Sequence, residues 1–187
     1  MALPHFTNIQ SHHENWEPVF KNLFEVEIFL PDLIRDRHPN GTQLLMENAT
    51  KAKIPTYVAL TSTSQRYKYS TRLFVGFPDT TSLTDVAITF NINQNDNKQM
   101  FTFRMIKDWY DLIWNNEDGS SHYKKNVLGS IILYQHDREG EIIRRITFHN
   151  CQILSFGDSG DLTWGGGAEI MELNATWACD WWEDYYF

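Results

Sequence analysis

Side chains that could do chemistry are plentiful in this sequence, but they do not form a recognisable catalytic or metal-binding pattern. The chain has seven histidines and 24 aspartates and glutamates. His12, His13 and Glu14 come nearest to a metal cluster, yet adjacent histidines point in different directions on a regular element, and no partner follows at helical spacing. No nucleophile elbow, zinc-binding helix or Walker loop occurs. We therefore predict no catalytic residue, no metal site and no cofactor, and favour a protein that is not an enzyme.

Two polar segments have some of the sequence features of ligand-binding loops. The alternating asparagines of residues 91–97 resemble a calcium loop but lack its glycine and its bidentate glutamate. Residues 156–161 and 165–167 are rich in glycine, but a phosphate-binding loop needs a following Lys and Ser/Thr with a helix behind them. A predicted strand follows instead. We interpret these segments as solvated turns and loops.

Composition limits the class of protein. The chain has 187 residues, enough for one domain with a substantial core. A formal net charge of −8 argues against a protein that binds nucleic acid through its phosphates, because such proteins present a basic surface. No apolar run is long enough to cross a bilayer, and the N-terminal residues show no secretory signal. Cys151 and Cys179 do not make a disulfide framework, so we expect two free, buried thiols in a reducing cytoplasm.

The elements that would have to position any site are mainly strands. Residues 123–182 are expected to form the central strands of the sheet. Two β-branched, aliphatic runs, at residues 123–134 and 141–148, flank the polar turn Asp137-Arg138-Glu139-Gly140. This pattern predicts a β-hairpin. After the glycine-rich loop, residues 170–182 are expected to add a third strand to the same sheet.

Upstream segments supply the other half of the sheet and one helix. Residues 98–115 carry Phe103, Ile106, Tyr110 and Ile113 at helical spacing, with Trp109 beside them, which predicts a helix packed on the sheet. Residues 32–41 are expected to form a charged loop. Strands are expected, from their alternation of apolar and polar residues, at residues 22–30, 44–52, 57–64, 66–77 and 85–93.

These elements predict a mainly β fold, a β-sandwich or barrel-like structure with one flanking α-helix. Residues 1–21 are polar, contain Pro4 and Pro18, and are expected to form an N-terminal arm. Residues 22–187 are expected to form a single domain. The second faces of several strands are fairly polar, so such strands can bury a core on one side and border water on the other.

Six segments follow one another in a characteristic order. They are residues 22–28, residues 52–55, residues 72–76 followed by 86–90, residues 101–109, residues 123–125 followed by 131–135 and 137–138, and residues 172–183. The order of these segments resembles the tail tube proteins of contractile-tailed bacteriophages, a family related to the inner-tube proteins of type VI secretion. The resemblance covers nearly the whole chain from Asn22 onward. Residues 32–41 and 184–187 depart from the family pattern and look like additions.

This resemblance implies a tail-tube-like fold and a structural subunit of a phage tail tube. It implies homo-hexameric rings that stack head to tail into a hollow tube, which conducts DNA and ejected proteins into the host. The implied partners are a sheath protein outside, and a baseplate hub and a tail terminator at the ends. Genomic DNA would pass through the lumen without specific binding, and no membrane insertion is implied. The implied location is the virion tail, assembled in the host cytoplasm.

Other functions remain open at this point. Within the same class, the chain could form a tube-initiator ring at the baseplate or the inner tube of a phage-derived injection system. A carbohydrate-binding β-sandwich is an alternative of another class, because the C-terminal aromatic residues could stack on sugars. An enzyme on a β scaffold would need convergent titratable groups, and the sequence offers no such set.

Aromatic residues near the arm, the middle of the chain and the C-terminus are the candidates for assembly surfaces. Aromatic side chains are enriched where subunits meet because they bury a large area at small conformational cost. The predicted interface residues are Phe6, Trp16, Tyr57, Tyr67, Tyr69, Trp181, Trp182, Tyr185 and Tyr186.

Overall fold

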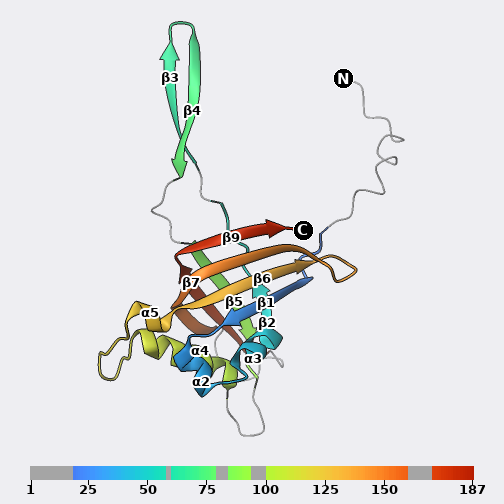
Figure 1. Ribbon diagram of the computed structural model, residues 1–187, viewed down its shortest axis with the longest axis vertical. Coiled ribbons are helices and arrows are strands. Elements are labelled where there is room, and N and C mark those ends of the chain that lie inside the picture. Colours follow the sequence, from blue (N-terminus) through green and yellow to red (C-terminus); the bar gives the residue numbers. More distant parts are fainter. Residues whose placement is uncertain (1–18, 58–59, 79–83, 94–99, 160–169) are drawn as a thin grey trace, which may run out of the picture.

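The computed structural model describes residues 19–57, 60–78, 84–93, 100–159 and 170–187. The fold is mainly β, as predicted (Figure 1). The strands are β1 (Phe24–Phe29), β2 (Ala49–Ala52), β3 (Leu60–Tyr67), β4 (Ser70–Pro78), β5 (Thr84–Asn91), β6 (Gly129–His136), β7 (Ile142–Ser159), β8 (Glu172–Cys179) and β9 (Trp181–Tyr186). The helices are α2 (Asp32–Arg37), α3 (Gly41–Asn48), α4 (Phe101–Ile113) and α5 (Lys124–Val127).

The long strand β7 belongs to both halves of a barrel-like sheet. Its first half pairs with β6 and β9, and its second half pairs with β8. Strand order is β1-β6-β7-β8-β5-β2, with β9 beside β7, and every pairing is antiparallel. β7 changes direction at Asn150, whose φ of 55° is in the left-handed region that Asn tolerates well. The two halves of β7 therefore serve two different sheets.

The core lies between these two sheets and under α4. Alternate residues of β1, β5 and β8 point inward, as the sequence predicted; Val26, Ile88 and Trp177 are fully buried examples. Trp109 of α4 lies 6.1 Å from Trp177, measured between ring centroids, and donates a hydrogen bond to the Val127 carbonyl oxygen at 2.9 Å. Helix α4 is thereby tied to both the sheet and α5.

The predicted helix at residues 98–115 is confirmed over Phe101–Ile113, but its buried face is centred differently. Ile106 is fully buried, as predicted, and so is Trp109 beside it. Met105 and Leu112 also face the core, whereas Phe103, Tyr110 and Ile113 are only half-buried. Residues 98–99 lie outside the described residues.

Three further helices replace predicted loop or strand. The expected loop at residues 32–41 contains α2, because Asp32 and the two late arginines suit the ends of a helix and Ile34 anchors it in the core. The expected strand at residues 44–52 is a helix, α3, up to Asn48, and only the last four residues form β2. Residues 124–127 are α5, not the start of the hairpin.

The C-terminal region also differs from the prediction. The expected single strand at residues 170–182 is two strands, β8 and β9, separated by a bend at Asp180. The supposed loop from residue 156 is still part of β7 as far as Ser159, and residues 160–169 lie outside the described residues. The turn predicted at residues 137–140 is confirmed, with Gly140 at a φ of 87°.

Both cysteines are free and buried, as predicted. The neighbouring Cys179 thiol, together with burial, raises the pKa of the Cys151 thiol. None of the helices in the described ranges is long and apolar enough to span a membrane.

Candidate assembly surfaces

Three of the predicted interface residues surround one carboxylate. Asp184 accepts two hydrogen bonds from Arg144, at 2.9 and 2.7 Å, in a bidentate pair. The hydroxyl groups of Tyr57 and Tyr186 also donate to Asp184, at 2.9 and 3.0 Å. Trp182 packs against Tyr57, with 4.8 Å between ring centroids. The segment before the β3–β4 hairpin is therefore held against the face of β9 that carries Trp182 and Asp184.

This network fixes the charge state of Asp184. The Arg144 guanidinium, with help from the two tyrosine hydroxyls, lowers the pKa of the Asp184 carboxyl below its usual range. In return, hydrogen bonding to Asp184 raises the pKa of Arg144 and of Tyr57. At neutral pH the pair is ionised, and its carboxylate orders the aromatic side chains around it.

The other face of β9 carries a second aromatic layer. Trp181 stacks on His149, with ring centroids 3.9 Å apart and an angle of 12° between the planes. Tyr185 lies under the Arg145 guanidinium at 5.0 Å and donates a hydrogen bond to Glu183 at 2.7 Å. Both aromatic rings remain partly exposed. They form a preordered, half-apolar layer on the same face of β9 as Glu183.

The remaining predicted residues do not join this cluster. Tyr69 is fully exposed at the tip of the β3–β4 hairpin, remote from β9 (Figure 1). Tyr67 closes the same hairpin opposite Ser70, but its side chain is not described. Phe6 and Trp16 lie outside the described residues, as does the His12–Glu14 segment. Sequence reasoning missed Arg144 and Asp184, whose pairing spans 40 positions.

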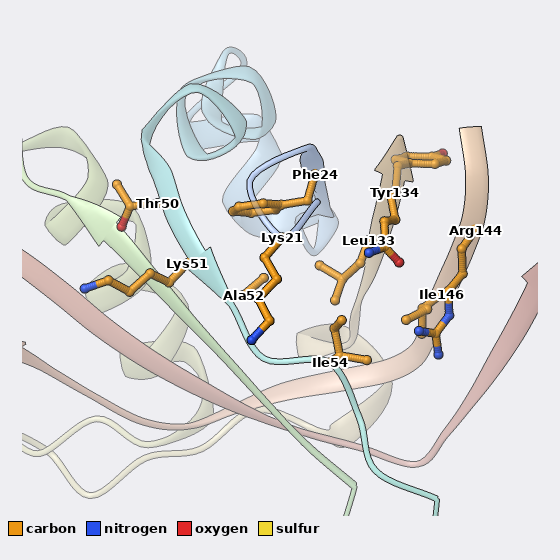
Figure 2. A pocket seen from close by; sticks show the side chains of 11 residues that line it. Lys21, Phe24, Thr50, Lys51, Ala52, Ile54, Leu133, Tyr134, Arg144 and Ile146 are labelled. Atoms are coloured by element: carbon orange, nitrogen blue, oxygen red, sulfur yellow. The ribbon is translucent and has the colours of Figure 1, made fainter. Parts of the chain in front are cut away.

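A cavity of about 270 Å³ is lined by residues of β1, β2, β6 and β7; β1 and β2, the two ends of the strand order, do not pair. Figure 2 shows Phe24, Leu133 and Ile54 around this space from three separate segments. Two of its cations already have carboxylate partners: Lys51 pairs with Glu172 at 3.0 Å and Arg144 with Asp184. The cavity is thus an apolar hollow rather than a gathering of titratable groups.

Among the described residues, no group of three or more His, Cys, Asp or Glu side chains is placed to hold a metal ion. The carbohydrate alternative depended on the C-terminal aromatic cluster. Trp177 is completely buried, and one face of Trp181 is covered by His149. A sugar-stacking platform would have to use the partly exposed Trp181, Tyr185 or Tyr186.

No family model matches the sequence, and no curated protein matches it. Several solved structures match the fold of the chain. The tube-terminating cap of the anti-feeding prophage matches with a TM-score of 0.58 at 13% identity, over 92% of this chain and 93% of that one. A chain of the sheath–tube complex of the extracellular contractile injection system PVC matches at 0.56 and 12%, over 99% and 100%. The PVC sheath/tube terminator also matches at 0.56 and 12%, over 91% and 98%.

The chain has the fold of the tube proteins of contractile injection systems. The predicted resemblance to the tail tube family is confirmed at the level of the fold. Two features of this fold leave surface uncovered within the described residues. The outer strands β1 and β9 of the sheet β1-β6-β7-β9 each pair on one side only, and the described side chains of the β3–β4 hairpin are exposed.

Proposed function

We propose that this protein is the structural subunit of a tube in a contractile-tail apparatus. Copies join side by side into a ring, and rings stack head to tail into a hollow tube. The observation that carries the proposal is the sheet β1-β6-β7-β9, whose two outer strands each have six residues and pair on one side only within the described residues. Open edges of this kind favour pairing with another chain.

Strand direction supports closure into a ring. β1 is antiparallel to β6, β6 to β7, and β7 to β9, so β9 runs opposite to β1. A rotation that brings β9 of one copy beside β1 of the next creates another antiparallel pair. The alternation then continues around the ring, which leaves no open edge in this sheet. From the family resemblance we take the number of copies in a ring to be six.

The outward face of this sheet suits a water-filled channel. It carries Glu25 and Glu27 on β1, Arg145 on β7 and Glu183 on β9, while the alternate residues of the same strands face the core. Carboxylates outnumber the guanidinium on this face. A channel wall of this composition repels the phosphate backbone of DNA and lets it pass without adhering.

The remaining partners follow from the same proposal. A sheath protein surrounds the tube, and a baseplate hub and a terminator close its ends. In a phage the tube conducts genomic DNA from the virion. In a phage-derived injection device the same tube conducts protein, and an initiator ring at the baseplate is a third setting for the same fold.

Electron microscopy of the purified chain tests the proposal. Negative-stain images and light scattering should show rings or hollow tubes. Replacing Phe29, exposed on β1, by Asp should prevent ring formation because it places a charge at the joint between copies. Leu33→Asp on α2, at a similarly exposed apolar residue, should assemble like the unmodified chain.

Three results would contradict the proposal. A chain that remains monomeric at every concentration and ionic strength is not a self-assembling tube subunit. Equal assembly by the two variants would show that the β1 edge does not take part in the contact between copies. Glycan binding by a monomeric chain would instead support the carbohydrate-binding alternative.

A further inference from the structure

The two cysteines lie on neighbouring strands, and the strand register brings their side chains together. β7 and β8 are antiparallel, and Ile153 is opposite Trp177 in this pairing. Two residues away on each strand, toward the bend between β8 and β9, lie Cys151 and Cys179 on the same face. Cys151 is completely buried, and Cys179 is 5% exposed. The chain therefore holds a cross-strand pair of free thiols in its core.

The spacing of such a pair is close to the spacing that a disulfide needs. Residues directly opposite each other on antiparallel strands have Cβ atoms about 4.5–5.5 Å apart, and a disulfide brings them to about 3.5–4.5 Å. Closure therefore needs an approach of about 1 Å. The pKa of the Cys151 thiol reflects this proximity, because the neighbouring Cys179 thiol, together with burial, raises it.

Both cysteines lie at the ends of strand ladders, where local opening is easiest. The ladder between β6 and β7 ends with Cys151 opposite Gly129. The ladder between β5 and β8 ends with Cys179 opposite Thr84. The ends of a ladder open more often than its centre. A small oxidant can reach the thiols during such openings, whereas a bulky reagent or a protein disulfide is excluded.

We propose that Cys151 and Cys179 are an oxidation site, which closes into a cross-strand disulfide when the folded protein meets a small peroxide. The site itself is argued from register and burial, and its use rests on the proposed tube function. A tube that is assembled in a reducing cytoplasm and works outside the cell passes from conditions that keep thiols reduced to conditions that favour a disulfide.

The reaction consumes one peroxide and both thiol protons. Cys179 is the less buried thiol, so its sulfur attacks one oxygen of hydrogen peroxide. The O–O bond breaks, and the other oxygen leaves with the Cys179 proton as water. The Cys151 sulfur then attacks the sulfenic acid sulfur of Cys179, the S–O bond breaks, and the hydroxide leaves with the Cys151 proton as a second water. The two thiols lose two electrons, which reduce the peroxide.

The new bond joins the two places at which the strands change direction. Cys151 follows Asn150, where β7 passes from one sheet to the other, and Cys179 precedes the bend at Asp180. A link between them holds the β9 edge in a fixed position on the core. It also closes a loop over residues 152–178, which removes conformational freedom from the unfolded chain. The oxidised protein should therefore be more stable than the reduced protein.

Peroxide treatment of the folded, full-length chain tests the site. Mass spectrometry without reduction should show the loss of two hydrogen atoms, and peptide mapping should find Cys151 joined to Cys179. The melting temperature should rise by about 5–10 °C and return to its first value after reduction with dithiothreitol. Hydrogen exchange of the β9 amides should slow in the oxidised chain.

Two matched variants separate the paired arrangement from the mere presence of thiols. Cys151→Ala keeps one thiol and should gain neither the link nor the rise in melting temperature. Cys179→Ala combined with Ala175→Cys keeps the composition of the chain but moves one thiol four residues along β8, on the same buried face and opposite Phe156. It should not cross-link in the folded state. Both variants also report any effect of methionine oxidation.

Three results would overturn the inference. A folded chain that gains oxygen at its methionines but forms no link between the cysteines has no disulfide site. Equal cross-linking of the variant with the displaced thiol would show that the link forms in unfolded chains and does not depend on the register. A link that changes neither the melting temperature nor β9 exchange would remove its stabilising role. All three leave the tube function intact, because assembly of the reduced chain tests that function separately.

Discussion

Removal of the Asp184 carboxylate tests whether its ion pair with Arg144 holds β9 in place. The side chains of Arg144 and Asp184 are only 17% and 5% exposed. Asp184→Ala leaves the guanidinium without its two hydrogen-bond acceptors in a largely dry position. Breaking a buried pair by removing one partner costs about 3–5 kcal/mol, and we take the lower end, about 3 kcal/mol, because Arg144 keeps some contact with water.

Denaturation in urea, followed by tryptophan fluorescence, measures this loss. For a chain of this length, about 3 kcal/mol corresponds to a fall in melting temperature of about 6–12 °C. The matched control is Asp180→Ala, because Asp180 also pairs with a cation, Lys124, at 2.8 Å, but these side chains are 41% and 56% exposed. Exposed pairs contribute about 0–1 kcal/mol. A loss at Asp184 no larger than the loss at Asp180 would refute the argument.

The pH dependence provides a second check. Since Arg144 lowers the pKa of Asp184 in the folded state, the carboxylate stabilises the fold above its unfolded pKa of about 3.9, and this contribution is lost as the pH falls through the lower folded pKa. The stability difference between the unmodified chain and Asp184→Ala should therefore be constant from about pH 5 to pH 7 and shrink below about pH 4. A difference that grows in acid would contradict the ion-pair explanation.

Three further outcomes are expected. Gly129→Ala should destabilise the fold by about 2–4 kcal/mol in urea denaturation, because a Cβ there would lie 2.7 Å from the Trp109 ring in the core. Gly140→Ala should cost only about 1 kcal/mol, from its φ of 87° alone, since nothing lies within 4 Å. Cys151 and Cys179, both buried, should resist iodoacetamide at pH 8 in the native state and react after unfolding, as measured by mass spectrometry; rapid native alkylation would contradict their burial.

Local patterns were enough to find much of the fold. Alternation predicted β1 and β5 because Val26 and Ile88 need only a core on one side of their strand. The hairpin β6–β7 followed from its turn, since Gly140 supplies the backbone conformation that the turn requires. The helix α4 was predicted because its apolar residues recur at helical spacing.

Elements that depend on distant partners were missed. α2 and α3 each bury few side chains, of which Ile34 and Leu45 are the main ones, so their apolar periodicity is weak. β9 was missed because Asp184 occupies an inward position where alternation demands an apolar residue. Arg144, on another strand, makes that carboxylate acceptable together with the hydroxyl groups of Tyr57 and Tyr186. The aromatic residues of the site were therefore predictable, whereas the ion pair that orders them was not.

The bend between β8 and β9 determines which strands can pair with a second copy. β5 pairs with β8 along its whole length and stops at Thr84, opposite Cys179. After the bend, β9 has β7 on one side and no paired strand on the other within the described residues. Asp180 lies at this bend, where its backbone N–H donates to the His149 carbonyl oxygen. Its exposed carboxylate accepts from Asn150 and Lys124.

Two different functions are thus divided between the halves of β7. Its second half, with β8 and β5, carries the buried tryptophan core, whereas its first half displays an edge strand on a sheet with a polar outer face. Since β7 is continuous through Asn150, any force on the β9 edge is transmitted directly to the core rather than through a flexible linker. In the proposed tube, the edge that pairs with the next copy and the core that resists unfolding would therefore share one strand.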